Sequence, residues 1–322
     1  MTNLNAETEF VNLMTVGSAA LRKAAVSDQA KQYILGNNTL YQLFSKAAHR
    51  YVAGETLEDA IARAAHYNRQ GLAASIEFMG ENVGNEQEAV TATGEFLAIC
   101  ENIASNGLTS SVSLDLSHIG LALSRELCQR HLDQICQKAK ESGIEVMISA
   151  EDAGKTDDVL DMYLGAAGRH ENLGITLQAY LHRTKEDFKK VVEKPNRIRL
   201  VKGAFQTEEG LSLPRGAELN RTYLGYLDLL LTNHHKCSIA THDPLIQQEA
   251  GKLISQHQMP GHLYEFESLL GIATNQLNEL MQSGHPAKIY IVYGHEWYLY
   301  LCNRIAENPM SIFLALEDMV QN

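Results

Sequence analysis

Cysteine is scarce in this sequence, and the cysteines that occur form no recognisable framework. Five of them are scattered over 322 residues, and none belongs to a Cys-x-x-Cys pair. An odd number of widely spaced cysteines does not suit a disulfide scaffold, and structural zinc sites use closely spaced ligands. We therefore expect reduced thiols in a cytoplasmic protein, with no bound metal.

Basic charge and long apolar runs are also lacking. The chain has 27 Lys and Arg residues against 39 Asp and Glu, a net charge of −12, and no basic cluster that would bind a phosphate backbone. Its first residues resemble no signal peptide, and no apolar run reaches the length of about 18 residues that a transmembrane helix needs. We expect no nucleic-acid partner, no membrane span, and a globular chain long enough for one large α/β domain.

An N-terminal helical segment is predicted over residues 1–68. Apolar residues between 40 and 48 recur with a helical period, and Thr56 with Asp59 forms a capping-box pattern before another helix. The pattern then changes, and we assign residues 69–322 to a separate barrel region.

Eight short apolar runs alternate with helix-like segments in that second region. Their spacing of roughly 25 to 40 residues accommodates a strand with its crossover helix, which implies parallel neighbours. The pattern predicts a (β/α)8 barrel. Its strands are expected at 74–78, 111–116, 144–148, 175–180, 198–201, 238–241, 263–266 and 289–292.

The last predicted strand leads into a short helix that ends at Asn308-Pro309. Aromatic and charged residues recur on this helix at spacings of three and four, which puts them on one face. These residues are Trp297, Tyr300, Arg304 and Glu307. A face that combines aromatic rings with an ion pair suits a flat ligand.

Functional residues of such barrels lie at the C-terminal ends of the strands. The predicted strand ends all carry polar side chains, which marks a candidate cavity. They are Glu77, Asp115, Glu151 with Asp152, Gln178, Lys202, Thr241 with His242, Glu267 and Tyr290.

Five motifs give the chain a family resemblance. They are Leu-Gln-Ala-Tyr-Leu at 177–181, Arg-Leu-Val-Lys-Gly-Ala-Phe at 199–205, Ala-Thr-His-Asp-Pro at 240–244, Phe-Glu-Ser-Leu-Leu-Gly at 266–271, and the segment 293–307. Together they resemble proline dehydrogenases, most closely the short monofunctional bacterial enzymes, over nearly the whole chain. The resemblance implies a distorted (β/α)8 TIM barrel with extra N-terminal helices, which binds FAD non-covalently beneath its last helix.

The same resemblance implies the FAD-binding residues, which are Gln178, Arg199, Lys202, Thr241, His242 and Glu307. Side-chain chemistry agrees, because cations suit a pyrophosphate or a reduced flavin, and an amide suits a pyrimidine edge. Ordinary interpretations stay open. Lys202 could be a surface ion-pair partner, Arg199 could pair with Glu151 or Glu267, and His242 could cap a helix.

Three positions depart from the family pattern for binding the substrate carboxylate. After strand two the family has a Lys, and this chain has Asp115; after strand three the family has an Asp, and this chain has Ser149. On the last helix the family has an Arg-Arg pair, of which this chain keeps only the second, as Asn303 followed by Arg304. The ring-lining side of the pocket is kept in Leu269, Tyr290 and Tyr300, and Phe205 replaces a Tyr. The resemblance implies that Tyr290, Tyr300 and Arg304 are the catalytic residues, which position the substrate for hydride transfer.

Three function classes follow. The first is an FAD-dependent oxidoreductase of proline metabolism that takes a hydride from a C–N bond. Its substrate would be proline or, as we expect, a proline-like amine with a masked or absent carboxylate. Examples are an amide, an ester, a carrier-bound prolyl group or a cyclic amine, including one with a cationic group near Asp115. Its electron acceptor, a quinone or another oxidant, is open. The second is a Schiff-base lyase using Lys202, and the third is a non-catalytic flavin-binding protein.

Overall fold

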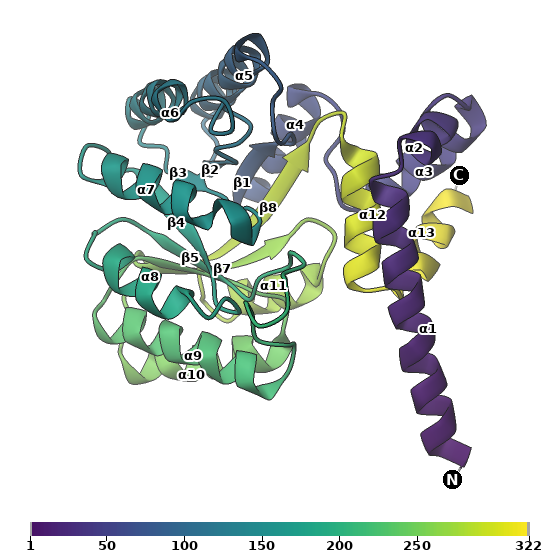
Figure 1. The fold of residues 1–322 in the computed structure, drawn as a ribbon. Helices are drawn as coiled ribbons and strands as arrows, with labels where there is room; N and C mark the ends of the chain where they lie inside the picture. Colours follow the sequence, from purple (N-terminus) through teal and green to yellow (C-terminus); the bar gives the residue numbers. More distant parts are fainter. Residues whose placement is uncertain (1, 321–322) are drawn as a thin grey trace.

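Eight parallel strands close into a barrel in which each strand pairs with its neighbours in chain order (Figure 1). The computed structural model describes residues 2–320. The strands are β1 (Ala73–Phe78), β2 (Ser110–Leu114), β3 (Val146–Ile148), β4 (Leu173–Gln178), β5 (Ile198–Val201), β6 (Cys237–Ala240), β7 (Tyr264–Leu269) and β8 (Ala287–Tyr293). The predicted (β/α)8 barrel is confirmed, with strand boundaries shifted by a few residues; β3 is the shortest.

The helices form two groups (Figure 1). The first surrounds the barrel and consists of α4 (Leu57–Arg69), α5 (Glu86–Ser105), α6 (Arg125–Lys140), α7 (Thr156–Ala167), α8 (Thr184–Val191), α9 (Ala217–Thr232), α10 (Pro244–Gln256) and α11 (Thr274–Gln282). The second lies to one side and consists of α1 (Thr2–Ala25), α2 (Asp28–Leu35), α3 (Asn38–Ala48), α12 (Trp297–Glu307) and α13 (Ser311–Val320). The division of the chain at residue 68 stays a prediction.

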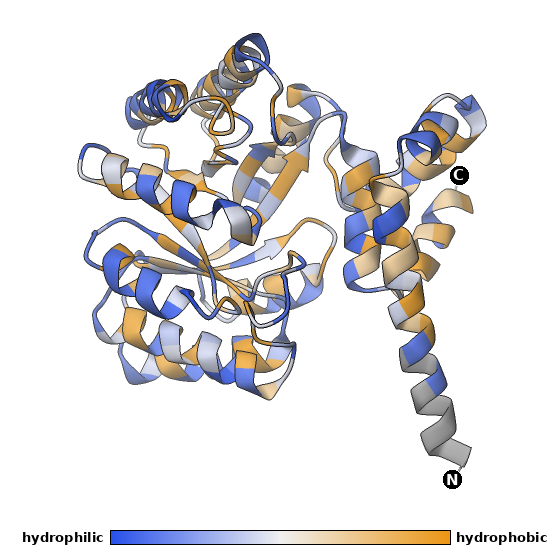
Figure 2. Cartoon of the chain, in the orientation of Figure 1, coloured by the Kyte–Doolittle hydropathy of each residue, from blue (hydrophilic) through white to orange (hydrophobic). Residues whose placement is uncertain are grey.

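Amphipathic patterning explains the first group. The helices around the barrel alternate hydrophilic and hydrophobic segments, whereas the strands are mostly hydrophobic (Figure 2). The predicted capping box is confirmed, since Thr56 and Asp59 exchange side-chain and backbone hydrogen bonds at the start of α4. No helix among residues 2–320 is both long and apolar enough to cross a membrane.

Helix α12 is joined to the N-terminal helices through a second apolar core. Trp297 lies there, with its indole nitrogen donating to Glu55 at 2.8 Å and its ring edge-on to Tyr41 at 5.6 Å. The prediction that Trp297 shares the ligand-facing surface is therefore wrong. The helical period does align it with Arg304, but Trp297 is in the first turn, where Glu55 and Tyr41 already cover that surface.

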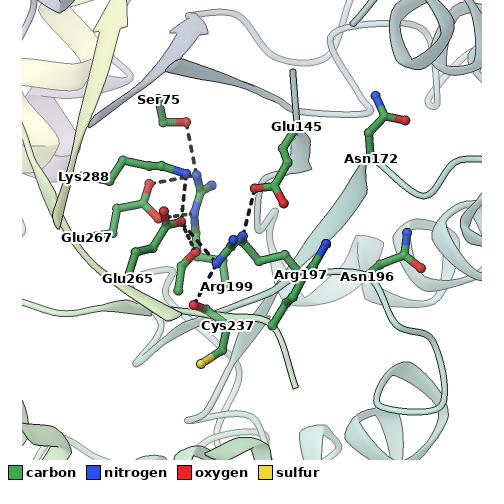
Figure 3. Close-up of polar contacts among 12 residues, drawn as sticks. Ser75, Glu145, Asn172, Asn196, Arg197, Arg199, Cys237, Glu265, Glu267 and Lys288 are labelled. Atoms are coloured by element: carbon green, nitrogen blue, oxygen red, sulfur yellow. Dashed lines mark hydrogen bonds and ion pairs between the residues drawn. The ribbon is translucent and has the colours of Figure 1, made fainter. Parts of the chain in front are cut away.

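The barrel interior is filled with paired charges (Figure 3). The Glu265 carboxylate forms a salt bridge with the Lys288 ammonium group at 2.8 Å, and it lies 3.7 Å from the Arg197 guanidinium group. Arg199 forms two hydrogen bonds of 2.8 Å with Glu267. Burial alone would raise the pKa of Glu265, but Lys288 and Arg197 outweigh it and lower the pKa to about 2. Removing one member of this group would therefore leave an uncompensated charge inside the barrel.

We predict that Glu265→Gln destabilises the fold by about 3 to 5 kcal/mol, because it leaves two buried cations without their shared carboxylate. Urea unfolding at neutral pH measures this. Glu249→Gln removes an exposed partner of Lys252 and should cost no more than about 1 kcal/mol.

The lowered pKa of Glu265 determines how its contribution to the free energy of unfolding changes with pH. The folded pKa of Glu265 lies below its ordinary value of 4.5, so its contribution is present above pH 4.5 and is lost as the pH falls toward 2. The stability difference between wild type and Glu265→Gln should shrink over that window. A constant difference across it would contradict this assignment.

Candidate functional site

A cavity of about 660 Å³ opens at the C-terminal ends of the strands. Its size is within the range of ligand pockets, and its place is where barrels of this kind build their sites. The strand-end residues Glu151 and Asp152 do not line it. The residues predicted to bind FAD or the substrate all do. They are Asp115, Ser149, Gln178, Arg199, Lys202, Phe205, Thr241, His242, Leu269, Tyr290, Tyr300, Asn303, Arg304 and Glu307.

Gln178, at the end of β4, has an unpaired buried oxygen that suits the expected cofactor. Its side-chain nitrogen donates to the carbonyl of Glu151 at 3.0 Å, while its side-chain oxygen is buried without a partner among the described residues. Buried acceptors are normally satisfied, so this oxygen calls for a ligand donor. The N–H of a flavin pyrimidine ring has the required chemistry.

Lys202 lies just after β5 and pairs with Asp243 at 2.6 Å. Asp243 also caps α10, accepting from the backbone N–H of Leu245 at 2.9 Å. The ammonium group is thereby placed beside a helix N-terminus, a combination that suits a phosphate. The pairing also argues against a Schiff-base role, because the side-chain nitrogen is engaged with the Asp243 carboxylate and a nucleophilic amine must be free to attack a carbonyl.

Arg199 is fixed from several sides inside the barrel. Besides Glu267, it donates to Ser113 at 2.8 Å, and its guanidinium lies 5.1 Å from the centre of the Tyr290 ring. Of the two ion pairs left open by the sequence, the one with Glu267 is present. Arg199 therefore forms a rigid cationic floor beneath the cavity.

Tyr290 and Ser149 are connected through a carboxylate that the site prediction omitted. The Tyr290 hydroxyl donates to Glu77, and the Ser149 hydroxyl donates to the same oxygen at 2.7 Å. Burial raises the pKa of Glu77. Its position at a strand end was visible in the sequence, but its pairing with residues far along the chain was not.

The cavity face of α12 consists of Tyr300, Asn303, Arg304 and Glu307. Arg304 pairs with Glu307 at 2.6 Å and lies 5.0 Å from the centre of the Tyr300 ring, which confirms the expected mixture of aromatic and charged groups. Burial raises the pKa of Tyr300 to about 12 and also raises that of Glu307. The ring of Tyr300 is thus a neutral wall over the cavity.

His242 joins two strand ends and does not cap a helix. Its Nε2 accepts from the backbone N–H of Leu269 at 3.0 Å, and burial lowers its pKa to about 4. It is therefore neutral at pH 7, and this hydrogen bond assigns its proton to Nδ1. The helix cap next to it is Asp243.

Several lining residues were not predicted from the sequence. Glu81 and Asn82 come from the loop after β1, Arg215 comes from the loop before α9, and Thr176 lies within β4. Loop residues carry no periodic signal. Thr176 could have been found from strand alternation, since it shares the parity of Gln178.

Comparisons with known proteins agree with this geometry. Residues 60–313 match the family model described as Proline dehydrogenase. Proline dehydrogenase 1 of Bacillus subtilis (strain 168) is 36% identical over 296 residues, which cover 89% of this chain and 97% of the relative. Proline dehydrogenase of Deinococcus radiodurans is 27% identical over 279 residues, covering 85% and 90%.

One solved structure shows the same fold. Proline utilization A (PutA) from Bdellovibrio bacteriovorus, inactivated by N-propargylglycine, superposes with a TM-score of 0.76 at 15% identity. The match covers 97% of this chain and 44% of that one, so this chain spans less than half of that protein.

We predict that Gln178→Leu purifies with much less flavin, because it removes the unpaired acceptor while keeping a side chain of similar size. The ratio of absorbance near 450 nm to absorbance at 280 nm measures occupancy. Asn172→Leu, just before β4 and outside the cavity lining, is a control that should keep its flavin. Full occupancy in Gln178→Leu would refute the assignment.

Tyr300→Ala should affect the substrate but not the cofactor. Removing the ring opens the wall over the cavity, so we expect the half-saturating substrate concentration to rise and flavin reduction to slow by at least about tenfold, as misplacement of reactants does. Flavin content should stay near that of wild type. Unaltered reduction kinetics would contradict the role of this wall.

Proposed function

The chain belongs to the proline dehydrogenase family, whose members are FAD-dependent oxidoreductases acting on CH–NH groups, and we propose that its substrate is a proline-like cyclic amine with a masked or absent carboxylate. Bound FAD supplies the acceptor for the hydride. The residues of this chain bind and orient the amine and exclude water. The observation that supports the proposal is the charge of the substrate end of the cavity.

That end is lined by Glu77, Glu81, Asp115 and Asn303. At the positions of Asp115 and Asn303, the family resemblance implies a Lys and an Arg. A hydrogen bond to a charged group contributes about 1.5 to 3 kcal/mol. Losing both weakens the binding of a free carboxylate on the order of a thousandfold.

Asp115 adds repulsion to that loss. Two like charges about 4 Å apart repel by about 4 kcal/mol at an effective dielectric constant near 20. Burial, and then the carboxylates Glu77, Glu151 and Glu81, raise the pKa of Asp115 well above its ordinary value. A protonated Asp115 would repel less, but it would still lack the attraction that a cation gives. A free substrate carboxylate is disfavoured in either protonation state.

The rest of the pocket retains groups for binding a ring. Tyr290, Tyr300 and Leu269 offer two aromatic walls and an aliphatic one, and Glu77 holds the Tyr290 hydroxyl in place. Arg304 can donate a hydrogen bond to a single acyl oxygen of the substrate if it gives up its contact with Glu307. An amide, an ester or a carrier-bound prolyl group meets this description, as does a cyclic amine with no acyl group.

Three further assignments belong to the same proposal. The substrate is a small molecule, free or carried on a protein, and the electrons pass from the flavin to a quinone or to another oxidant. We place the protein in the cytoplasm.

The test is anaerobic stopped-flow reduction of the bound flavin by L-proline and by L-prolinamide. We expect prolinamide to reach half-saturation at a concentration at least about a hundredfold lower, from the lost and repulsive contacts above. Saturable bleaching by L-proline at millimolar concentration or below would overturn the proposal and make free proline the substrate.

Asn303→Arg provides a gain-of-function test. Restoring one arginine beside Arg304 should lower the half-saturating concentration of L-proline about tenfold or more, the equivalent of one charged hydrogen bond. Asn303→Gln keeps a neutral amide and should not. Equal values for the two variants would show that position 303 does not face the substrate carboxylate.

A further inference from the structure

Carboxyl groups gather where β1, β2 and β3 end. They are Glu77, Glu81, Asp115 and Glu151, whose charges act on one another. Glu151 has partners, because it pairs with Lys155 at 2.9 Å and accepts from the backbone N–H of Ser117 at 3.0 Å. None of the other three has a salt bridge with any residue in the described part of the chain.

The nearby cations of the cavity do not pair with these carboxyl groups, because three of them have a counter-ion of their own and the fourth donates to a backbone carbonyl. Arg199 pairs with Glu267, Lys202 with Asp243, and Arg304 with Glu307, at 2.6 to 2.8 Å. Arg215 donates to the carbonyl of Gly203 at 2.7 Å. The excess charge of the cavity is therefore negative, and it lies on the β1–β3 side.

Asp115 and Glu81 have no side-chain hydrogen bond to any described residue, and of these two Asp115 is the less exposed. Glu77 is satisfied by two hydroxyl groups. Asp115 lines the cavity and has neither a hydroxyl nor an amide donor. Asp115 is half-buried and faces the cavity, so a cationic ligand there would supply the partner that the described residues do not.

A second, independent observation points to a ligand at the same wall. Thr176 is 8% exposed and lines the cavity, and its hydroxyl has no partner among the described residues. Ser149 lies between Thr176 and Asp115. The backbone N–H of Ser149 donates to the carbonyl of Leu114, the residue before Asp115, at 2.9 Å. The pairing of Ile148 with Ile175 places Ser149 beside Thr176. Asp115, Ser149 and Thr176 thus form a polar row across three strands.

We propose that the substrate is a dication, a cyclic secondary amine that carries a second basic group on the ring carbon next to nitrogen, and that Asp115 receives this second cation. The inference rests on the proposed function, since it assigns a charge to the group that replaces the carboxylate. Glu81 adds attraction at the cavity rim, and the Thr176 hydroxyl is available to a polar group of the same substituent.

An organic cation fits this wall better than a metal ion does. No group of three or more His, Cys, Asp or Glu side chains within the described residues is arranged to hold a metal. The unpaired carboxyl groups instead face a roomy cavity beside the aromatic ring of Tyr290, surroundings that suit an ammonium or guanidinium group on a ring.

A series of ligands that differ in one charge tests the inference on the flavin-loaded enzyme. L-Proline, L-prolinamide and (S)-2-(aminomethyl)pyrrolidine carry a negative, a neutral and a positive group on the same ring carbon. Calorimetric titration measures binding whether or not the ligand is oxidised, and anaerobic flavin bleaching measures reduction. We expect the aminomethyl compound to bind at least about tenfold more tightly than prolinamide, the equivalent of one charged contact.

Two variants assign the preference to Asp115. Asp115→Asn, which keeps the shape and removes the charge, should reduce the preference for the aminomethyl compound over prolinamide at least about tenfold. Asp115→Lys should reverse the order of the series in favour of L-proline. If neither variant retains flavin, Glu81→Gln serves instead and should reduce the same preference by a smaller factor.

The outcomes separate this inference from the proposed function. Equal binding of prolinamide and the aminomethyl compound, with both better than L-proline, would overturn the second cation and leave the masked carboxylate intact. Tightest binding of L-proline would overturn both. A preference for the aminomethyl compound that survives in Asp115→Asn and Glu81→Gln, or no binding of it at all, would overturn the role given to this wall.

Discussion

The pairing of Arg199 with Glu267 is the interaction on which the site depends. Both side chains are almost completely buried, and the two hydrogen bonds between them join β5 to β7 across the barrel. An unpaired charge in this position would be strongly destabilising, so the pair is obligatory once either residue is present. The hydroxyl of Ser113 and the ring of Tyr290 then take their positions from Arg199.

This floor separates two parts of the barrel with different tasks. Below it, Glu265, Lys288 and Arg197 neutralise one another and stabilise the strands (Figure 3). Above it, the side chains border a cavity and are free to bind ligands. The helix that covers this cavity, α12, is held from outside, by Trp297 on Glu55 and by Ser18 donating to the carbonyl of Ala306 at 2.7 Å. The N-terminal helices thereby contribute to the site without lining it.

Sequence patterns predicted the barrel and the residues gathered at its mouth, because alternation and strand ends are local properties of the chain. They could not predict the partners. From the sequence, the ion-pair partner of Arg199 could be either Glu151 or Glu267, and no partner could be named for Lys202. Both partners depend on how strands that are far apart in the sequence meet in the fold. The prediction for Trp297 failed for a related reason. A helical period gives the side of the helix on which a side chain lies, but it does not show whether other residues already cover that part of the helix. Glu81 and Arg215 lie in loops, where neither period applies.

The pairing of charges also gives a reason why the end of the cavity that we assign to the substrate could change sign while the end that we assign to FAD keeps its charges. Lys202, Arg199 and Arg304 each have a carboxylate within hydrogen-bonding distance, so their local fields are largely neutralised and a distant substitution alters them little. Asp115 and Asn303 lie outside these pairs. A Lys at position 115 would face Glu77 and Glu81, whereas Asp115 leaves all three carboxyl groups to the ligand. On our proposal, the ligand supplies the missing cation of the site, and the enzyme selects its substrate by the charge that the protein itself does not supply.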